Sequence, residues 1–70
     1  MTQQVLTEIQ DGVIIIRLNR TDKKNALTSA MYDAMREAIA ASNDDSNVRV
    51  VFIHGQPDCF TAGNDLADFQ

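Results

Sequence analysis

The spacing of apolar residues changes along the chain, and the first spacing predicts strands. Residues 5–9 and 13–18 are short runs rich in β-branched side chains, which favour extended structure. Asp11 and Gly12 lie between them, and glycine accepts the positive φ that a two-residue hairpin turn requires. The beginning of the chain therefore predicts a β-hairpin.

A helical spacing follows the polar residues 19–28. The apolar residues at this spacing are Ala30, Met31, Ala34, Met35, Ala38 and Ile39. Thr28 and Ser29 are both residue types that cap helix N-termini, and residues 42–47 are rich in helix breakers. We expect an amphipathic helix over about residues 29–41.

Residues 48–53 form a mostly apolar run, which is typical of a strand buried on both faces of a parallel sheet. With the preceding strand and helix this run makes a βαβ unit, so the predicted fold class is α/β in the order ββαβ. Gly63 is a flexible point, and Asp65 is a candidate N-cap for a further helix that has only begun when the sequence stops. One helix covers one sheet face, so we expect the other face to need further chain.

Size and composition exclude several classes of protein. The 70 residues allow one small domain with a thin core, and a single cysteine and a single histidine exclude an internal disulfide and a Cys/His metal set. A net charge of −4 with scattered basic residues argues against nucleic acid as a partner. The longest apolar run, residues 13–16, is too short for a membrane span, and no signal peptide is visible, so we expect a cytoplasmic setting.

Two stretches together resemble a known family. "NRTDKKNALT", residues 19–28, and "FTAGNDL", residues 60–66, which follows "VRVVFIHG", closely resemble the paired motifs of the crotonase superfamily, the enoyl-CoA hydratases and isomerases. The resemblance extends over essentially all of the chain. It implies that residues 1–70 are the N-terminal ββαβ part of a single crotonase-like (ClpP/crotonase spiral) domain, truncated after its first oxyanion-hole turn. Thr21 departs from the pattern, since many relatives have proline there.

The resemblance also implies a chemistry. Family members act on acyl-CoA thioesters through an enolate-like intermediate, whose oxygen is stabilised by two backbone N–H groups. It identifies the Asn64 N–H as the first donor, in a turn that includes Ala62, Gly63, Asp65 and Leu66 and that the substrate approaches closely. Coenzyme A enters as part of the substrate, so no separate cofactor is expected. Without the upstream motif, the same turn reads as an ordinary helix cap.

The loop "KKNAL" has a family role in holding the CoA nucleotide. The resemblance places Lys24, Ala26 and Leu27 at this site, with backbone groups around Lys24 and Ala26 against adenine or pantetheine. Lys23, Lys24 and Arg20 are candidates for phosphate contacts, since their cationic groups donate to phosphate oxygens. A solvated basic loop is the equally simple interpretation of the lysines.

Other reactive side chains fit structural roles better. Cys59 is best explained by packing and His54 by its place at a strand end, because no orienting group completes a Cys–His pair. Asp65 and Asp68 match no acid/base position of the family, and capping or solvation explains them.

The second oxyanion glycine, the acid/base carboxylates and the C-terminal helices of the family would lie outside these residues. The sequence therefore leaves hydratase, isomerase and hydrolase open, and the isolated chain is expected to be inactive. The resemblance implies a homotrimeric or hexameric parent. The alternatives are a non-catalytic fragment or a small βαβ module that folds only by association.

Overall fold

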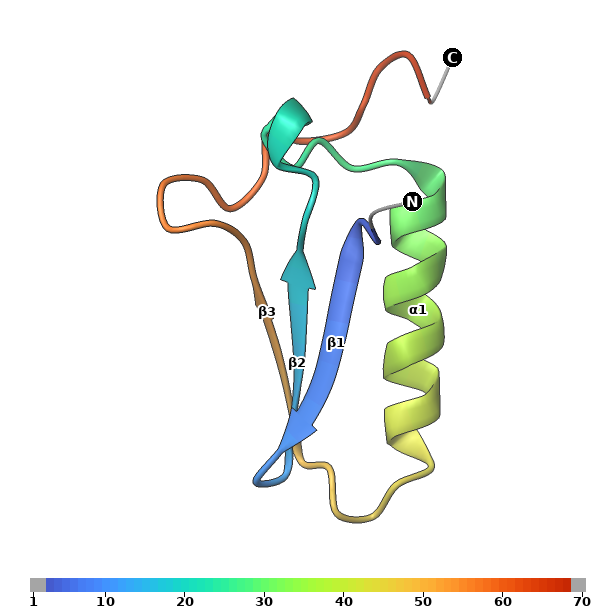
Figure 1. The fold of residues 1–70 in the computed structure, drawn as a ribbon. Coiled ribbons are helices and arrows are strands. Elements are labelled where there is room, and N and C mark those ends of the chain that lie inside the picture. The colour runs from blue at the N-terminus through green and yellow to red at the C-terminus, as the bar shows by residue number, and fades with distance from the viewer. Residues whose placement is uncertain (1–2, 69–70) are drawn as a thin grey trace.

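A computed structural model describes residues 3–68 of the chain. Its elements follow in the order β1 (Val5–Gln10), β2 (Val13–Leu18), the 3₁₀ turn η1 (Thr21–Lys23), α1 (Ser29–Asn43) and β3 (Val50–His54) (Figure 1). The predicted ββαβ order is confirmed. The helix ends two residues later than predicted, and β3 begins two residues later. The N–H groups of Arg49 and Val50 both donate to the Gly12 carbonyl, which joins the start of β3 to the hairpin turn.

The Asp11-Gly12 turn determines the register of the hairpin. Asp11 has a φ of 53° and Gly12 a φ of 82°, so both central residues adopt the positive φ of the turn type that matches the twist of paired strands. The antiparallel pairing runs from Val5 opposite Leu18 to Gln10 opposite Val13. The predicted hairpin is confirmed.

The sheet has the order β1-β2-β3, with β2 in the centre and β3 parallel to it. Alternate residues of β2 point to opposite faces, so Ile14, Ile16 and Leu18 are buried while their neighbours are half-buried. Met31 of α1 is also buried and completes this small core. The helix lies alongside β1 and β2 on one side of the sheet (Figure 1).

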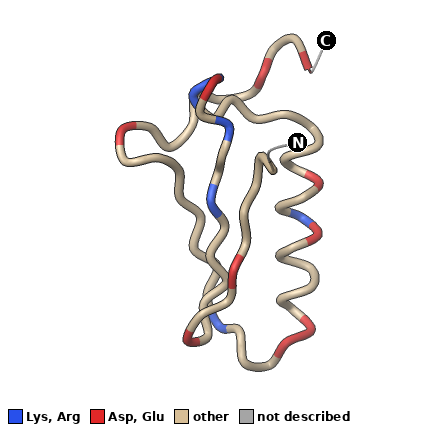
Figure 2. The backbone as a smooth tube through the Cα atoms, viewed as in Figure 1, with Lys and Arg blue, Asp and Glu red and all other residues tan. Residues whose placement is uncertain are grey.

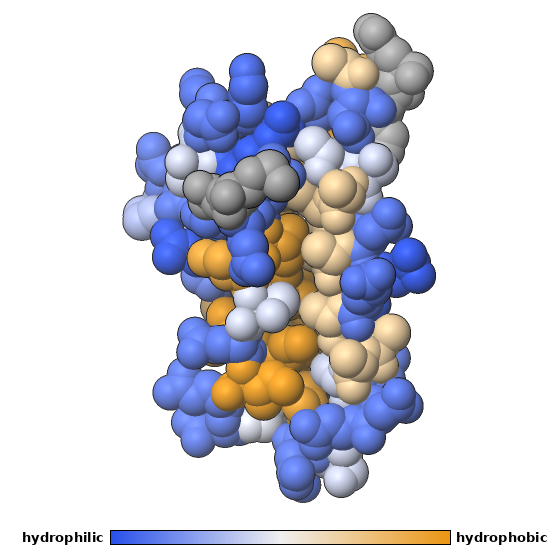
Figure 3. All heavy atoms as spheres, turned by 45° about the vertical axis from the view of Figure 1, so that its right-hand side comes forward, coloured by the Kyte–Doolittle hydropathy of each residue, from blue (hydrophilic) through white to orange (hydrophobic). Residues whose placement is uncertain are grey.

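An open groove lies between α1 and β1. Its helical wall is formed by small side chains, Ala30, Ala34 and Ala38, and its strand wall by Val5 and Thr7. Figure 3 shows apolar side chains of the strands still visible between the sheet and the helix. The layer of apolar side chains between α1 and the sheet is therefore thin, as expected for a chain of this length.

The expectation that the third strand is buried on both faces was wrong. Val50, Val51, Phe52 and Ile53 are all classed as exposed, and Phe52 is 53% exposed. The reason is positional, since α1 packs over β1 and β2 and no described element covers β3 or pairs with its outer edge. The apolar run correctly indicated a strand, but its burial needs cover that residues 3–68 do not provide.

Thr28, rather than Ser29, is the N-cap of α1. Its backbone is extended, and its Oγ1 accepts a hydrogen bond from Met31 N at 3.1 Å. This cap lies at the end of the molecule where β2 and β3 finish, together with residues 19–28 and 55–68 (Figure 1). In sheets with parallel strands, ligands bind beyond the carboxyl ends of the strands, so this end is the place to search for a site.

Candidate functional site

The two stretches with family-like motifs are paired with each other at this end. Leu27 and Asn64 form an isolated parallel bridge, in which Leu27 N donates to Gly63 O at 2.8 Å and Asp65 N donates to Leu27 O at 2.8 Å. The loop before α1 and the segment after β3 are therefore joined as two short extended strands.

This bridge determines the direction of the Asn64 N–H. In a parallel bridge, one residue uses both its N–H and its C=O, whereas the residue opposite directs its own groups to the other side. Leu27 is the residue that uses both, so the Asn64 N–H points away from it. Within residues 3–68 this N–H has no hydrogen-bond acceptor, although Gly63 N and Asp65 N on either side are both bonded. The Asn64 N–H, which the family resemblance identifies as an oxyanion donor, is thus not used in any hydrogen bond among the described residues.

The backbone before this donor is open on one side. Gly63 has a φ of 95°, and a Cβ built on it would meet no atom within 4 Å. Ala62 is exposed, while its N–H is held by the Lys24 carbonyl at 3.0 Å. A ligand atom can therefore approach the backbone here, as the small side chains predict.

The side chain of Asn64 is directed to the helix. Its Oδ1 accepts a hydrogen bond of 2.6 Å from the hydroxyl of Tyr32, in the first turn of α1. The contact restrains residue 64 without involving its backbone N–H. The side chain of Asn64 therefore joins residue 64 to α1, while its backbone N–H stays available to a ligand.

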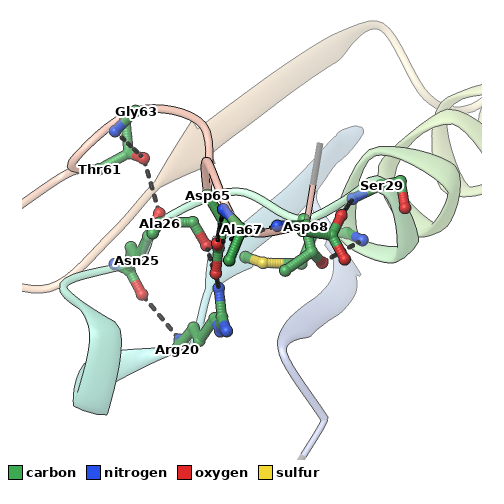
Figure 4. A network of polar contacts seen from close by, with 11 residues as sticks. Arg20, Asn25, Ala26, Ser29, Thr61, Gly63, Asp65, Ala67 and Asp68 are labelled. Carbon is green, nitrogen blue, oxygen red and sulfur yellow. Dashed lines mark hydrogen bonds and ion pairs between the residues drawn. The ribbon is translucent and has the colours of Figure 1, made fainter. Parts of the chain in front are cut away.

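Asn25 is the buried centre of the site, and its importance was not predicted. It is fully buried, with a φ of 57°, a left-handed conformation that asparagine tolerates better than most residues. Its Oδ1 accepts from Arg20 N at 2.7 Å and its carbonyl accepts from Thr61 Oγ1 at 2.6 Å (Figure 4). Its Nδ2 donates to Phe60 O at 3.1 Å. The available sequence signal was an asparagine inside the "KKNAL" loop, whose side chain had been given no role of its own.

Arg20 and Asp65 form an ion pair across the same two segments. Arg20 Nη1 lies 2.7 Å from Asp65 Oδ2 and also donates to Ala26 O at 3.1 Å (Figure 4). The hydrogen bond from Arg20, followed by the N–H group of Asp68, lowers the pKa of the Asp65 carboxyl below its ordinary value. Arg20 is thus directed toward the protein, in contrast to the phosphate contact considered from the sequence.

Asp65 also organises the turn that follows it. Its Oδ1 accepts from the N–H groups of Ala67 and Asp68, at 3.0 and 3.2 Å. Asp65 therefore makes side-chain contacts of the kind that an N-cap makes. The helix that it was predicted to begin does not appear, since residues 66–68 form a turn and Phe69 lies outside the described residues. Asp68 in turn accepts from Ser29 N at 2.7 Å, and Leu66 is 78% exposed.

The basic loop presents its lysines to solvent. Lys23 and Lys24 are exposed. Figure 2 shows basic and acidic positions next to each other in the segment after β2, rather than a field of one sign. The N–H groups of Ala26 and Leu27 already donate, to Lys23 O and Gly63 O. Any ligand contact at these two backbones must therefore use a second carbonyl lone pair or apolar atoms.

Cys59 and His54 contact different partners. Cys59 Sγ lies 3.5 Å from Lys24 O, whereas the His54 ring stacks on Phe52 with centroids 5.3 Å apart. The Cys59 contact agrees with the packing role expected for it, and His54 is the last residue of β3, as expected. Within residues 3–68, no three metal-ligating side chains come together, and no described helix is long and apolar enough to cross a membrane.

The chain is similar to proteins of one family. A model of the enoyl-CoA hydratase/isomerase family matches residues 8–70. Human enoyl-CoA delta isomerase 2 is 44% identical over 61 residues, which cover 86% of this chain and 15% of that protein. The Mycobacterium leprae protein named "Probable enoyl-CoA hydratase echA6" is 43% identical over 60 residues. These residues cover 81% of this chain and 24% of that protein.

A solved structure supports the same relationship. The structure of Pseudomonas aeruginosa OdaA matches with a TM-score of 0.91 at 48% sequence identity, over 97% of this chain and 28% of that one. This chain therefore spans between 15% and 28% of the length of these three proteins.

Proposed function

Because this chain belongs to the enoyl-CoA hydratase/isomerase family of the crotonase superfamily, we propose that it is the acyl-CoA-binding segment of an enzyme that stabilises a thioester enolate. The family match confirms the family that the sequence predicts, and the structural match confirms that this chain corresponds to the N-terminal region of the crotonase fold. The proposal concerns what this segment contributes to the reaction.

The observation that supports the proposal most is the free Asn64 N–H. When a proton leaves or joins the acyl chain beside a thioester, negative charge gathers on the thioester oxygen. A backbone N–H that is held in place and has no internal partner can donate to that oxygen without reorganisation. The open backbone at Ala62 and Gly63 gives the oxygen room to approach.

The basic loop is the proposed contact for coenzyme A. Lys23 and Lys24 project from the turn that leads to Ala26 and Leu27, and their ammonium groups can donate to phosphate oxygens. The bridge between Leu27 and Asn64 places this loop next to the proposed oxyanion donor. One segment would then hold both the CoA moiety and the thioester.

A complete reaction needs groups beyond this segment. A single N–H donor without a second donor and without an acid or base leaves most of the rate enhancement unaccounted for. We therefore propose that the segment acts within a longer chain, in a cytoplasmic enzyme that assembles as a trimer or hexamer. The choice between hydratase and isomerase belongs to residues outside the segment.

A second candidate role is a fragment that acts only by association. The exposed apolar residues of β3 favour it, since Val50 to Ile53 are exposed along an unpaired edge. Such a surface is unusual in a small protein that acts alone. Association and membership of the family are compatible, because the association would complete the same domain.

Kinetics of two variants at residue 64 test the proposed function. In the protein at its full encoded length, Asn64→Pro removes the N–H, whereas Asn64→Ala keeps it and removes only the side chain. We expect Asn64→Pro to lower kcat for crotonyl-CoA by about 10²–10³-fold and Asn64→Ala to have a much smaller effect. Equal losses in two variants that are both folded would contradict the backbone-donor role.

A further inference from the structure

We propose that Asn25, acting through Thr61, positions the backbone amide of Asn64. Neither side chain is expected to touch the substrate, so both are positioning residues and not catalytic ones. The inference rests on the proposed function, because it concerns the aim of the proposed oxyanion donor. The polar contacts of one buried side chain support it.

Asn25 is bonded on both sides of the site. On its own loop, its backbone N donates to Arg20 O at 2.9 Å and its Oδ1 accepts from Arg20 N at 2.7 Å. On the opposite segment, its Nδ2 donates to Phe60 O and its carbonyl accepts from Thr61 Oγ1. A fully buried carboxamide with no solvent to replace these bonds holds the two segments in one arrangement.

Thr61 passes this constraint to the donor. Its hydroxyl donates to Asn25 O at 2.6 Å and accepts from Gly63 N at 3.1 Å (Figure 4). Gly63 O in turn accepts from Leu27 N. The residue that precedes Asn64 is thus held at both its N–H and its carbonyl, which restrains the peptides on either side of Gly63.

The position of Gly63 explains why such a constraint is needed. Its φ of 95° lies in a region that glycine adopts without steric cost, and a Cβ built at this position would meet no atom within 4 Å. Without the Thr61 bond, Gly63 would keep only the Leu27 contact at its carbonyl, and rotation about the flexible Gly63 would tilt the next peptide and its donor. Catalytic groups lose about 10²-fold in rate when they are displaced by about 1 Å, so the restraint has a direct functional value.

Thr61 offers a matched pair of variants. Thr61→Val keeps the shape and removes both hydroxyl bonds, whereas Thr61→Ser keeps the hydroxyl and removes only the methyl group. Asn25→Asp is the second test, since it keeps the acceptor for Arg20 N and replaces the donor that faces Phe60 O. Ile16→Val is the control, because it weakens the buried core at β2 and removes none of the hydrogen bonds of Asn25 and Thr61.

The experiment uses the protein at its full encoded length and two readouts. The first is kcat and KM for crotonyl-CoA. The second is the ¹³C chemical shift of bound butyryl-CoA labelled at the thioester carbonyl, which moves when a hydrogen bond polarises that carbonyl. The melting temperature of each variant is measured alongside, so that lost stability can be separated from lost aim.

We expect Thr61→Val and Asn25→Asp to lower kcat by about 10²-fold and to move the ¹³C shift toward that of free butyryl-CoA. Thr61→Ser should restore both readouts, and Ile16→Val should lower only the melting temperature. If Asn25→Asp does not fold, the Thr61 pair decides the question by itself.

Two results would overturn the inference, and they differ in what else they overturn. If Asn64→Pro abolishes the ¹³C shift but Thr61→Val leaves the shift and kcat unchanged, the network is merely structural and the proposed function stands. If the unmodified protein turns over no acyl-CoA and shifts no carbonyl signal, the proposed function and the inference both fall.

Discussion

Arg20 Nη1 lies 2.7 Å from Asp65 Oδ2, and these residues are 45 positions apart in the chain. The pair joins the loop before α1 to the turn after β3, beside the parallel bridge between Leu27 and Asn64. Both side chains are mostly screened from solvent, at 15% and 19% exposed. The ion pair is therefore part of the same connection that holds the proposed oxyanion donor.

The pair predicts a change of stability in acid. The pKa of Asp65 is lowered in the folded state, first by the Arg20 hydrogen bond and then by the backbone N–H groups that it accepts. Its contribution is therefore present above the unfolded pKa, near pH 4, and is lost as the pH falls through the lower folded value. Urea unfolding of Asp65→Asn and the unmodified protein should differ at pH 7, and the difference should shrink as the pH falls through the lowered pKa of Asp65. A difference that stays constant throughout the acid range would count against the ion pair.

The N-cap of α1 predicts a second effect on stability. Thr28 Oγ1 accepts from Met31 N, so Thr28→Val removes the acceptor while keeping the shape. The free energy of unfolding should fall by about 1 kcal/mol, within a range of about 0.5–2, and Thr28→Ser should recover most of it. Urea unfolding followed by circular dichroism measures both. No loss in Thr28→Val would show that the cap is satisfied in another way.

Gly55 and Gly63 should respond differently to the same substitutions. At Gly55 an added Cβ would lie 2.5 Å from Phe60 O, so alanine and asparagine should both be costly for steric reasons. At Gly63 nothing obstructs a Cβ, and the cost, about 1–3 kcal/mol for alanine, comes from the φ of 95° alone. Gly63→Asn should be milder than Gly63→Ala, because asparagine tolerates positive φ. Melting temperatures of the four variants check this, and the same order at both glycines would refute it.

Local patterns predicted the elements of the fold well. The Asp11-Gly12 turn and the helical spacing after Thr28 are encoded within a few residues, and both appear as expected. The burial of β3 was not predictable from its apolar run, since burial depends on what packs against a strand. Residues 50–53 therefore formed the expected strand and remained exposed.

The contacts of the candidate site were also predictable only in part, because many of them join residues that are far apart in the sequence. Family-like motifs located Asn64 and the loop around Ala26, and the structure brings these segments together. The roles of Asn25 and Arg20 depend on partners about 35 to 45 residues away, so no local pattern could assign them. Arg20 was considered for phosphate because its charge is visible in the sequence, but its ion pair with Asp65 is not.

The isolated chain should not catalyse the reaction. It offers one proposed donor, and the remaining groups of an oxyanion hole and an acid or base are expected elsewhere. Purified residues 1–70 mixed with crotonyl-CoA should show no loss of the enoyl absorbance beyond that in buffer. Hydration above the buffer rate, which also disappears in Asn64→Pro, would mean that this segment is a sufficient catalyst.

The most direct test of the central claim replaces the residue-64 N–H alone. In the Asn64→Ala background, the amide nitrogen of residue 64 is exchanged for an ester oxygen, which leaves the chain path and every side chain unchanged. Butyryl-CoA labelled with ¹³C at the thioester carbonyl is then bound to both proteins at their full encoded length. We predict that the carbonyl signal of the amide form is displaced from that of free butyryl-CoA and that the ester form loses much of this displacement. An identical carbonyl shift in both forms would contradict the assignment of Asn64 as the oxyanion donor.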